Sequence, residues 1–213
     1  MQSWIMLGDM GRPTVGAKFW FLFAHGAGAP KSSAWMLKYF DLLTQIAPVR
    51  SFNYDYMELG KKRPDPLPRL IEAHRKALKA GQADLGPNAI LIGKSMGGRV
   101  GCHLALEENV SKVVCLGYPL RSMGKVPKLR DEVLLQMSCP ALFVQGTRDN
   151  LCPLETLREV LKRRAAKSEL FVVESGNHSL QPTKTYLKQT GKSETELEAD
   201  ILQAIGHFVA PES

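Results

Sequence analysis

Residues 89–99 read Ala-Ile-Leu-Ile-Gly-Lys-Ser-Met-Gly-Gly-Arg, and they indicate the fold more directly than any other part of the chain. An apolar run of strand length ends at Gly93, and a G-x-S-x-G pattern follows with Ser95 at its centre. Residues 98–108 then have the composition of a helix. A strand, a tight turn carrying a serine and a helix form the context of a nucleophile elbow. Side chains at Gly93 and Gly97 would collide with the neighbouring strand or helix, which explains the two glycines.

Composition describes one soluble domain over residues 1–213, with 44% hydrophobic and 23% charged residues. We expect residues 1–16 to form either a short edge strand or a poorly ordered arm. No apolar run approaches the ~20 residues of a membrane span, and the N-terminus lacks the basic and apolar regions of a secretory signal. The four cysteines have no C-x-x-C spacing, so we expect reduced thiols in a cytoplasmic protein.

The net charge of +7 raises the question of nucleic acid. The basic clusters at 61–63 and 162–164 are not interleaved with aromatic residues, and no nucleic-acid-binding motif is present. We therefore expect neither a nucleic-acid nor a membrane partner, and we interpret the charge as a solvated basic surface. Attraction for acidic partners or anionic substrates is the alternative. Zinc, phosphate-loop and dinucleotide motifs are also missing, so we expect no metal and no cofactor.

The rest of the chain alternates between strand and helix patterns. We predict strands at 18–24, 49–54, 89–92, 112–116, 141–145 and 169–173. We predict helices at 33–47, 67–80, 98–108, 131–137, 154–166 and 194–209. Nearly continuous apolar strands indicate a sheet buried on both faces, so we predict a three-layer α/β/α fold with a mostly parallel central sheet. In such folds the functional loops gather beyond the carboxyl ends of the strands.

Ser95 needs a base within hydrogen-bond reach, and the base needs an orienting group. His178 follows the last predicted strand directly and is the candidate base, because the histidines at 74, 103 and 207 fall within predicted helices. Asp149 follows the strand 141–145 and is the candidate acid, although it could instead stabilise its own turn. Glu174 is the second candidate for the acid. The order serine, aspartate, histidine is the α/β-hydrolase order and differs from those of chymotrypsin and subtilisin.

A glycine-rich loop, His25-Gly26-Ala27-Gly28, follows the first strand. Its glycines permit a backbone whose N–H groups face a reacting carbonyl, so we predict an oxyanion hole with one donor from Gly26 or Ala27 and one from Met96. A merely glycine-rich turn is the alternative interpretation. We also expect His25 and Tyr118, in loops that border the site, to contact substrate.

Taken together, these motifs resemble a known family. His-Gly-Ala-Gly-Ala, Gly-Lys-Ser-Met-Gly-Gly-Arg, Tyr-Pro-Leu, Lys-Leu-Arg-Asp-Glu, Leu-Phe-Val-Gln-Gly-Thr-Arg-Asp and Asn-His-Ser occur in the order found in α/β-hydrolases close to the dienelactone-hydrolase-like proteins. This branch includes the testis-expressed hydrolase-like protein and the hydrolase-like domain of NSL complex subunit 3. The similarity covers about residues 18–209.

The resemblance implies a triad of Ser95, Asp149 and His178, and it implies that residues 117–132 border the site. Larger relatives insert a lid there, whereas this chain has no sizeable cap, which suggests an open site. Arg121-Ser122-Met123 departs from relatives that place histidine in this segment, so the resemblance assigns it no specificity role.

Two hypotheses follow. The first is a serine hydrolase of small-molecule carboxylic esters or thioesters, working through an acyl-serine intermediate. The second is a non-catalytic interaction module on a hydrolase scaffold.

Overall fold

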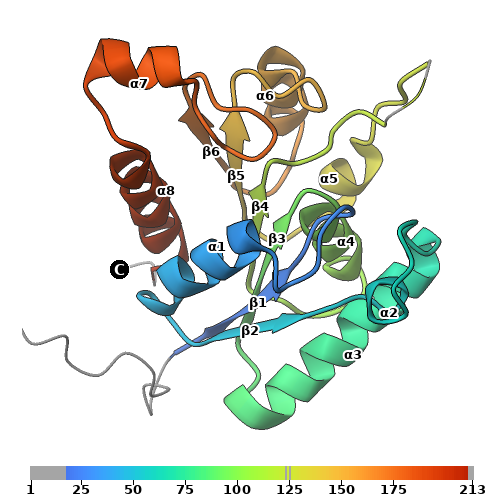
Figure 1. Cartoon of the computed structure of the whole chain (residues 1–213). Helices are drawn as coiled ribbons and strands as arrows, with labels where there is room; N and C mark the ends of the chain where they lie inside the picture. Colours follow the sequence, from blue (N-terminus) through green and yellow to red (C-terminus); the bar gives the residue numbers. More distant parts are fainter. Residues whose placement is uncertain (1–17, 123, 125, 211–213) are drawn as a thin grey trace, which may run out of the picture.

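The computed structural model describes residues 18–122, 124 and 126–210. A single sheet of six parallel strands runs through this part of the molecule in the order β2-β1-β3-β4-β5-β6 (Figure 1). The strands are β1 (Trp20–Ala24), β2 (Val49–Phe52), β3 (Ala89–Lys94), β4 (Lys112–Leu116), β5 (Ala141–Gly146) and β6 (Ser168–Val173). The predicted fold class is confirmed. The arm or edge strand predicted for residues 1–16 lies outside the described residues.

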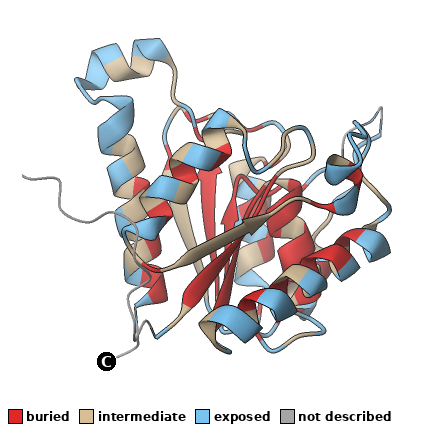
Figure 2. Cartoon of the chain, turned by 60° about the horizontal axis from the view of Figure 1, so that its bottom comes forward, coloured by how far each residue is buried: buried red, intermediate tan, exposed pale blue. Residues whose placement is uncertain are grey.

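Helices cover both faces of the sheet. They are α1 (Ala34–Thr44), α2 (Asp55–Glu58), α3 (Leu67–Leu85), α4 (Met96–Leu104), α5 (Glu132–Gln136), α6 (Leu154–Lys162), α7 (Lys184–Thr190) and α8 (Glu194–Val209). One face packs against α1 and α8, and the other packs against α3, α4, α5 and α6. Figure 2 shows the central strands buried between helices whose outer sides are exposed.

The continuous apolar character of β3 follows from this layering. Ile90 and Ile92 belong to the cluster beneath α1 and α8, whereas Ala89 and Leu91 belong to the cluster beneath α3 and α4. Because both faces are covered, successive residues are apolar instead of alternating with polar ones.

Close packing of α3 on β1 depends on a residue without a side chain. A Cβ at Gly81 would lie 2.1 Å from the ring of Trp20, so the indole occupies the space where a side chain of α3 would stand. The indole Nε1 also donates a hydrogen bond to the carbonyl of Gly86 at 2.8 Å. Trp20 therefore joins the last turns of α3 and its C-cap residue to the sheet.

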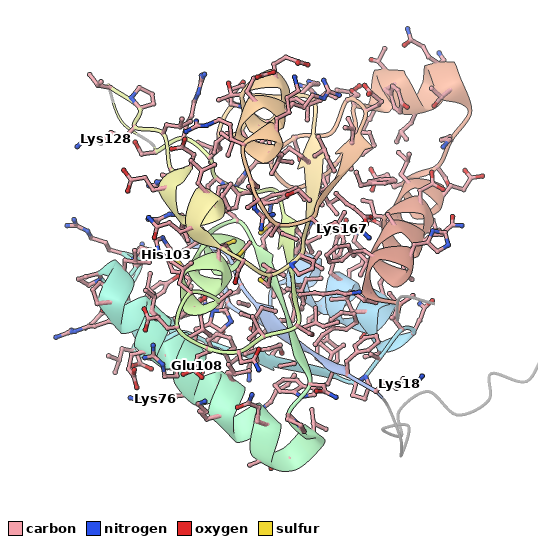
Figure 3. The ribbon with its side chains drawn as sticks, turned by 180° about the vertical axis from the view of Figure 1, so that it is seen from behind. Lys18, Lys76, His103, Glu108, Lys128 and Lys167 are labelled. Atoms are coloured by element: carbon pink, nitrogen blue, oxygen red, sulfur yellow. The ribbon has the colours of Figure 1, made fainter. Side chains whose placement is uncertain are left out.

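Ion pairs join α3 to the segment that follows α4. Both carboxylate oxygens of Glu108 are engaged, one by Nε of Arg75 at 3.0 Å and one by Nζ of Lys79 at 2.6 Å. Figure 3 shows Glu108 beside α3, in a view from behind. These contacts connect the segment after α4 to α3.

The predicted strands match the observed ones closely, but two helices were missed. Residues 55–58 and 184–190 form α2 and α7, and α4 begins two residues before the predicted 98. Helix α7 has no buried residue and extends beyond the ends of β5 and β6 (Figure 1). Both missed helices are short, so neither is a sizeable cap.

Two further expectations concern the described residues. All four cysteines are free thiols, as expected. Among these residues, no helix has both the length and the apolar character needed to cross a membrane.

Candidate active site

The turn between β3 and α4 holds Ser95 in a backbone conformation that serine rarely adopts, with φ 49° and ψ −113°. Strain of this kind costs on the order of 1–3 kcal/mol. Strand and helix approach closely here, since a Cβ at Gly93 would lie 2.2 Å from the backbone nitrogen of Gly98. A Cβ at Gly97 would lie 2.5 Å from the carbonyl oxygen of Ala24. The collisions predicted for positions 93 and 97 are therefore confirmed.

Loops at the carboxyl ends of β3, β5 and β6 bring Ser95, Asp149 and His178 together. Ser95 Oγ lies 2.7 Å from Nε2 of His178, and Nδ1 of His178 lies 2.7 Å from Oδ2 of Asp149. A carboxylate only accepts, so Nδ1 carries the proton and Nε2 accepts from the serine hydroxyl. Ser95 and His178 are partly exposed, whereas Asp149 is buried. A substrate can thus reach the serine while the carboxylate is shielded from water.

The environment of Asp149 keeps its carboxylate charged. Burial raises the pKa of Asp149, but hydrogen bonds from His178, from the Leu151 N–H and from Gln145 outweigh burial and leave the pKa below its ordinary value. The Gln145 amide donates at 2.6 Å and the Leu151 N–H at 2.9 Å. Glu174, the second candidate for the acid, is exposed, and Nδ1 of His178 is already bonded to Asp149.

Buried side chains hold the loop that follows β1. The N–H of Tyr54 donates to Nε2 of His25 at 3.1 Å, so Nδ1 carries the proton and donates to the carbonyl of Gly26 at 2.6 Å. Burial lowers the pKa of His25, which keeps the ring neutral. The hydroxyl of Tyr56 donates to the carbonyl of Ala27 at 3.0 Å. The predicted contact between His25 and substrate is not supported, because the ring is buried and both its nitrogens are engaged.

Two backbone N–H groups, one in this loop and one at the start of α4, are available as donors. In a trans peptide the N–H points opposite to the carbonyl, so the Ala27 N–H points away from the ring of His25. Within the described part of the chain, neither the Ala27 N–H nor the Met96 N–H has a hydrogen-bond partner. Gly26 lies against the serine turn, since a Cβ there would be 3.6 Å from Cβ of Ser95. The two unpaired donors therefore belong to segments that flank Ser95.

Tyr118 has a structural environment. Its hydroxyl donates to the carbonyl of Arg130 at 3.0 Å, and its ring packs edge to face on Phe143 with centroids 5.7 Å apart. The side chain is buried, so the predicted contact with substrate is not supported by its placement. The ring instead anchors the loop after β4 in the core.

Sequence reasoning missed two polar residues at strand ends. Gln145 accepts the N–H of Tyr118 at 3.0 Å while its amide holds Asp149, so it connects two of the loops. Lys94, the residue before Ser95, is buried, and burial lowers its pKa to about 8 although the charge of Asp149 opposes this. The sequence signal that could have identified both residues is a polar side chain at the end of an otherwise apolar strand.

The arrangement can move a proton from a hydroxyl to an imidazole and stabilise the resulting charge with a carboxylate, which makes a serine nucleophilic. Across the residues described, no group of three or more His, Cys, Asp or Glu side chains could hold a metal ion.

Comparison with known proteins gives matches in sequence. The family model "Alpha/beta hydrolase domain" matches residues 17–210. Protein sumv-2 of Caenorhabditis elegans is 29% identical over 105 residues, which are 49% of this chain and 9% of that protein. The chain thus spans less than a tenth of the length of this relative.

Solved structures with a similar fold are α/β hydrolases. A serine hydrolase homologue from Coxiella burnetii has a TM-score of 0.70 at 16% identity, with 90% of this chain and 85% of that chain covered. Dienelactone hydrolase from Anabaena variabilis has a TM-score of 0.67 at 18% identity, with coverage of 92% and 87%. A lidless serine hydrolase from Xanthomonas campestris has a TM-score of 0.69 at 15% identity, with coverage of 96% and 88%. At such identities the likeness shows the fold alone.

Proposed function

Because the chain belongs to the alpha/beta hydrolase domain family, we propose that it is a serine hydrolase that cleaves carboxylic esters or thioesters through an acyl-Ser95 intermediate. The observation that carries the proposal is the hydrogen-bonded series of Ser95, His178 and Asp149, with 2.7 Å at both links. All three groups lie where an α/β fold gathers functional loops, beyond the carboxyl ends of parallel strands.

In the proposed reaction, Ser95 Oγ attacks the carbonyl carbon of the substrate while its proton passes to Nε2 of His178. The buried carboxylate of Asp149 stabilises the imidazolium through Nδ1–H. The same Nε2 proton then passes to the leaving alcohol or thiol, which departs as the acyl-enzyme forms. Water, deprotonated by His178, then attacks the acyl carbonyl. As the bond to Ser95 Oγ breaks and the acid leaves, Nε2 returns the proton to Oγ, which restores Ser95 and the neutral imidazole.

The negative oxygen that forms in each step needs donors that are already in place. We propose the N–H groups of Met96 and Ala27 for this role, because both lack a partner within the described residues and flank Ser95. Between the two candidates in the glycine-rich loop, Ala27 is favoured over Gly26, since His25 holds the Gly26 carbonyl and thereby fixes the direction of the Ala27 N–H. Removing one such donor typically costs ~10²–10³ in rate.

A small-molecule acyl ester or thioester is the substrate class that we propose. The described chain has no sizeable cap over the strand ends, so acyl groups would enter from an open surface. Neighbours in structure include an esterase domain from Rhodothermus marinus and Est1E from Butyrivibrio proteoclasticus. The name of the first favours an ester bond, and turnover of acyl esters compared with acyl thioesters distinguishes the two substrate classes.

The interaction-module hypothesis has less support. A scaffold that only binds partners has no need for a strained serine, an oriented imidazole and a charged buried carboxylate. Backbone strain at a serine persists only where the surrounding structure maintains it, which is typical of functional sites. The short match to a much longer C. elegans protein identifies no partner for this chain.

Turnover of p-nitrophenyl esters, from acetyl to octanoyl, tests the proposal. We expect a burst of p-nitrophenol stoichiometric with enzyme, followed by steady turnover, because acylation and deacylation are separate steps. Ser95→Ala should lower the rate on the order of 10³-fold or more. Ser32→Ala, at an exposed serine, is the matched control and should behave as the wild type does. A folded wild type without turnover, or Ser95→Ala with full turnover, would contradict the proposal.

A further inference from the structure

A buried lysine directly precedes the serine of the elbow. Lysine is seldom buried unless its ammonium has partners, yet Lys94 is only 9% exposed. Its Nζ donates a hydrogen bond to the backbone carbonyl of His178. The lysine thus links the strand that carries Ser95 to the loop that carries the imidazole, through the main chain and not through the ring.

A second donor holds the next carbonyl of the same loop. Nε1 of Trp35, in α1, donates to the carbonyl of Ser179 at 3.0 Å. The two donors also contact each other, because Nζ of Lys94 lies 5.1 Å from the centroid of the Trp35 ring. The ring is itself fixed by stacking on Tyr39, with centroids 4.0 Å apart. Two consecutive carbonyls are therefore held from β3 and from α1.

The loop cannot supply these contacts itself. Oδ1 of Asn177 accepts from the N–H groups of Ser179 and Gln181, at 2.8 and 3.1 Å. The N–H groups of Leu180 and Asn177 donate to other carbonyls of the loop. Within the described residues, therefore, no donor of the loop reaches the carbonyls of His178 and Ser179. Leu180 has a positive φ of 62°, a strained conformation for leucine. A loop of this kind keeps its shape only when surrounding contacts maintain it.

Close contact with Gly117 also restricts the His178 carbonyl. A Cβ at Gly117, where β4 ends, would lie 2.6 Å from that oxygen and 3.3 Å from Nζ of Lys94. The carbonyl and the lysine ammonium therefore both pack against the backbone that follows β4.

We propose that Lys94, aided by Trp35, is a positioning residue: it fixes the backbone of His178 relative to Ser95 and so maintains the bond between Oγ and Nε2. The proposal rests on the proposed hydrolase function. Lys94 takes no proton from the substrate or from Ser95. It acts only by fixing the position of the imidazole of His178. Its effect should appear in kcat and in loop opening, and not in substrate affinity.

Lys112 provides a matched control. Its Nζ donates to the backbone carbonyls of Phe208 and Ala210, at 2.7 and 3.1 Å, and lies 5.3 Å from the ring centroid of Phe208. It therefore makes the same kinds of contact as Lys94, but at the start of β4 instead of at the carboxyl ends of the strands. Replacing either lysine by methionine removes the charge and keeps a side chain of similar length.

The experiment compares wild type, Lys94→Met and Lys112→Met by hydrogen exchange of peptides covering residues 174–183 and by ester kinetics. Hydrogen bonds to charged groups are strong enough that Lys94→Met should speed loop exchange by about tenfold or more and lower kcat by about tenfold, with KM within about twofold. Lys112→Met should change neither. Trp35→Phe keeps a ring and removes the N–H donor, so it tests the second contact and replaces Lys94→Met if that variant does not fold.

The proposal would be overturned if loop exchange in Lys94→Met, or in Trp35→Phe where that variant replaces it, equalled that of wild type. Faster exchange with unchanged kcat would also overturn it. A wild type without turnover would contradict the proposed function instead. In that case loop exchange still decides whether Lys94 holds the backbone of His178.

Discussion

At the scale of single residues, burial distinguishes the two candidate acids. The side chain of Asp149 is fully buried and accepts from His178, Gln145 and the Leu151 N–H. Glu174 is exposed, and water weakens the interaction of an exposed carboxylate with a nearby imidazolium. Burial and these hydrogen bonds therefore favour Asp149 as the group that would orient the ring and stabilise its positive charge.

Asp149→Asn tests this assignment. The amide keeps the shape of the side chain but removes the negative charge and can favour the wrong tautomer of His178, so we expect kcat to fall on the order of 10³–10⁴-fold. Glu174→Gln is the control, with an expected kcat within about twofold of wild type. Steady-state kinetics on p-nitrophenyl acetate measures both. The reverse pattern would assign the acid to Glu174.

Sequence reasoning located Ser95, Asp149 and His178 because each follows an apolar strand in a parallel sheet, and such ends meet in space. It could not locate Lys94, since the variable position before the serine of G-x-S-x-G accepts many residues. Its contact with the His178 carbonyl depends on how a loop more than eighty positions away crosses the end of β3.

At the scale of elements, the packing of α3 on β1 reverses the usual effect of a helical glycine. Replacing glycine by alanine inside a helix generally stabilises it by about 0.5–1 kcal/mol. At position 81 the added methyl would lie 2.1 Å from the Trp20 ring, whereas at position 206 in α8 the nearest atom would be 3.9 Å away. One glycine is required by packing and the other is not.

Urea denaturation of Gly81→Ala and Gly206→Ala measures this difference. We expect Gly81→Ala to lower the free energy of unfolding by about 1–3 kcal/mol through overpacking. Gly206→Ala should raise it by about 0.5–1 kcal/mol. A stabilising Gly81→Ala would show that Trp20 does not fill the space beside α3.

The two missed helices escape a periodicity argument for different reasons. Helix α2 has only four residues, too few to show a helical period, although Tyr56 is buried. Helix α7 buries no residue, so it has no apolar stripe for a periodicity argument to detect. Its ends do carry signals: Thr183 caps the first turn by accepting from the N–H of Tyr186, and Gly191 ends the helix with a φ of 70°. Local capping stabilises α7, whereas burial of an apolar face stabilises the helices that were predicted.

At the scale of the whole molecule, a buried neutral histidine makes stability depend on pH. Burial, aided by the nearby His25, lowers the pKa of His74 to about 3. Its Nδ1 bonds to the Tyr54 hydroxyl at 3.1 Å, but among the described residues its buried Nε2 has no hydrogen-bond partner that could stabilise a proton there. The unfolded chain takes up this proton below its ordinary pKa of 6.5 while the folded protein does not, so stability falls as the pH drops below 6.5.

Between pH 7 and pH 5, this histidine alone should lower the free energy of unfolding by about 2 kcal/mol. His74→Gln removes the titration and keeps a polar partner for the Tyr54 hydroxyl, so its loss of stability over the same range should be smaller by about that amount. Urea denaturation at both pH values provides the comparison. An equal loss in wild type and variant would show that His74 is not the group responsible.

The central claim is that Ser95 is an activated nucleophile, and covalent labelling measures this without knowledge of the substrate. After treatment with a fluorophosphonate, mass spectrometry should find one adduct, on the peptide that carries Ser95. The adduct should be absent in Ser95→Ala and should form more slowly in Asp149→Asn, because the imidazole loses its orienting charge. A folded wild type that acquires no adduct, or equal labelling of Ser95→Ala, would contradict the claim.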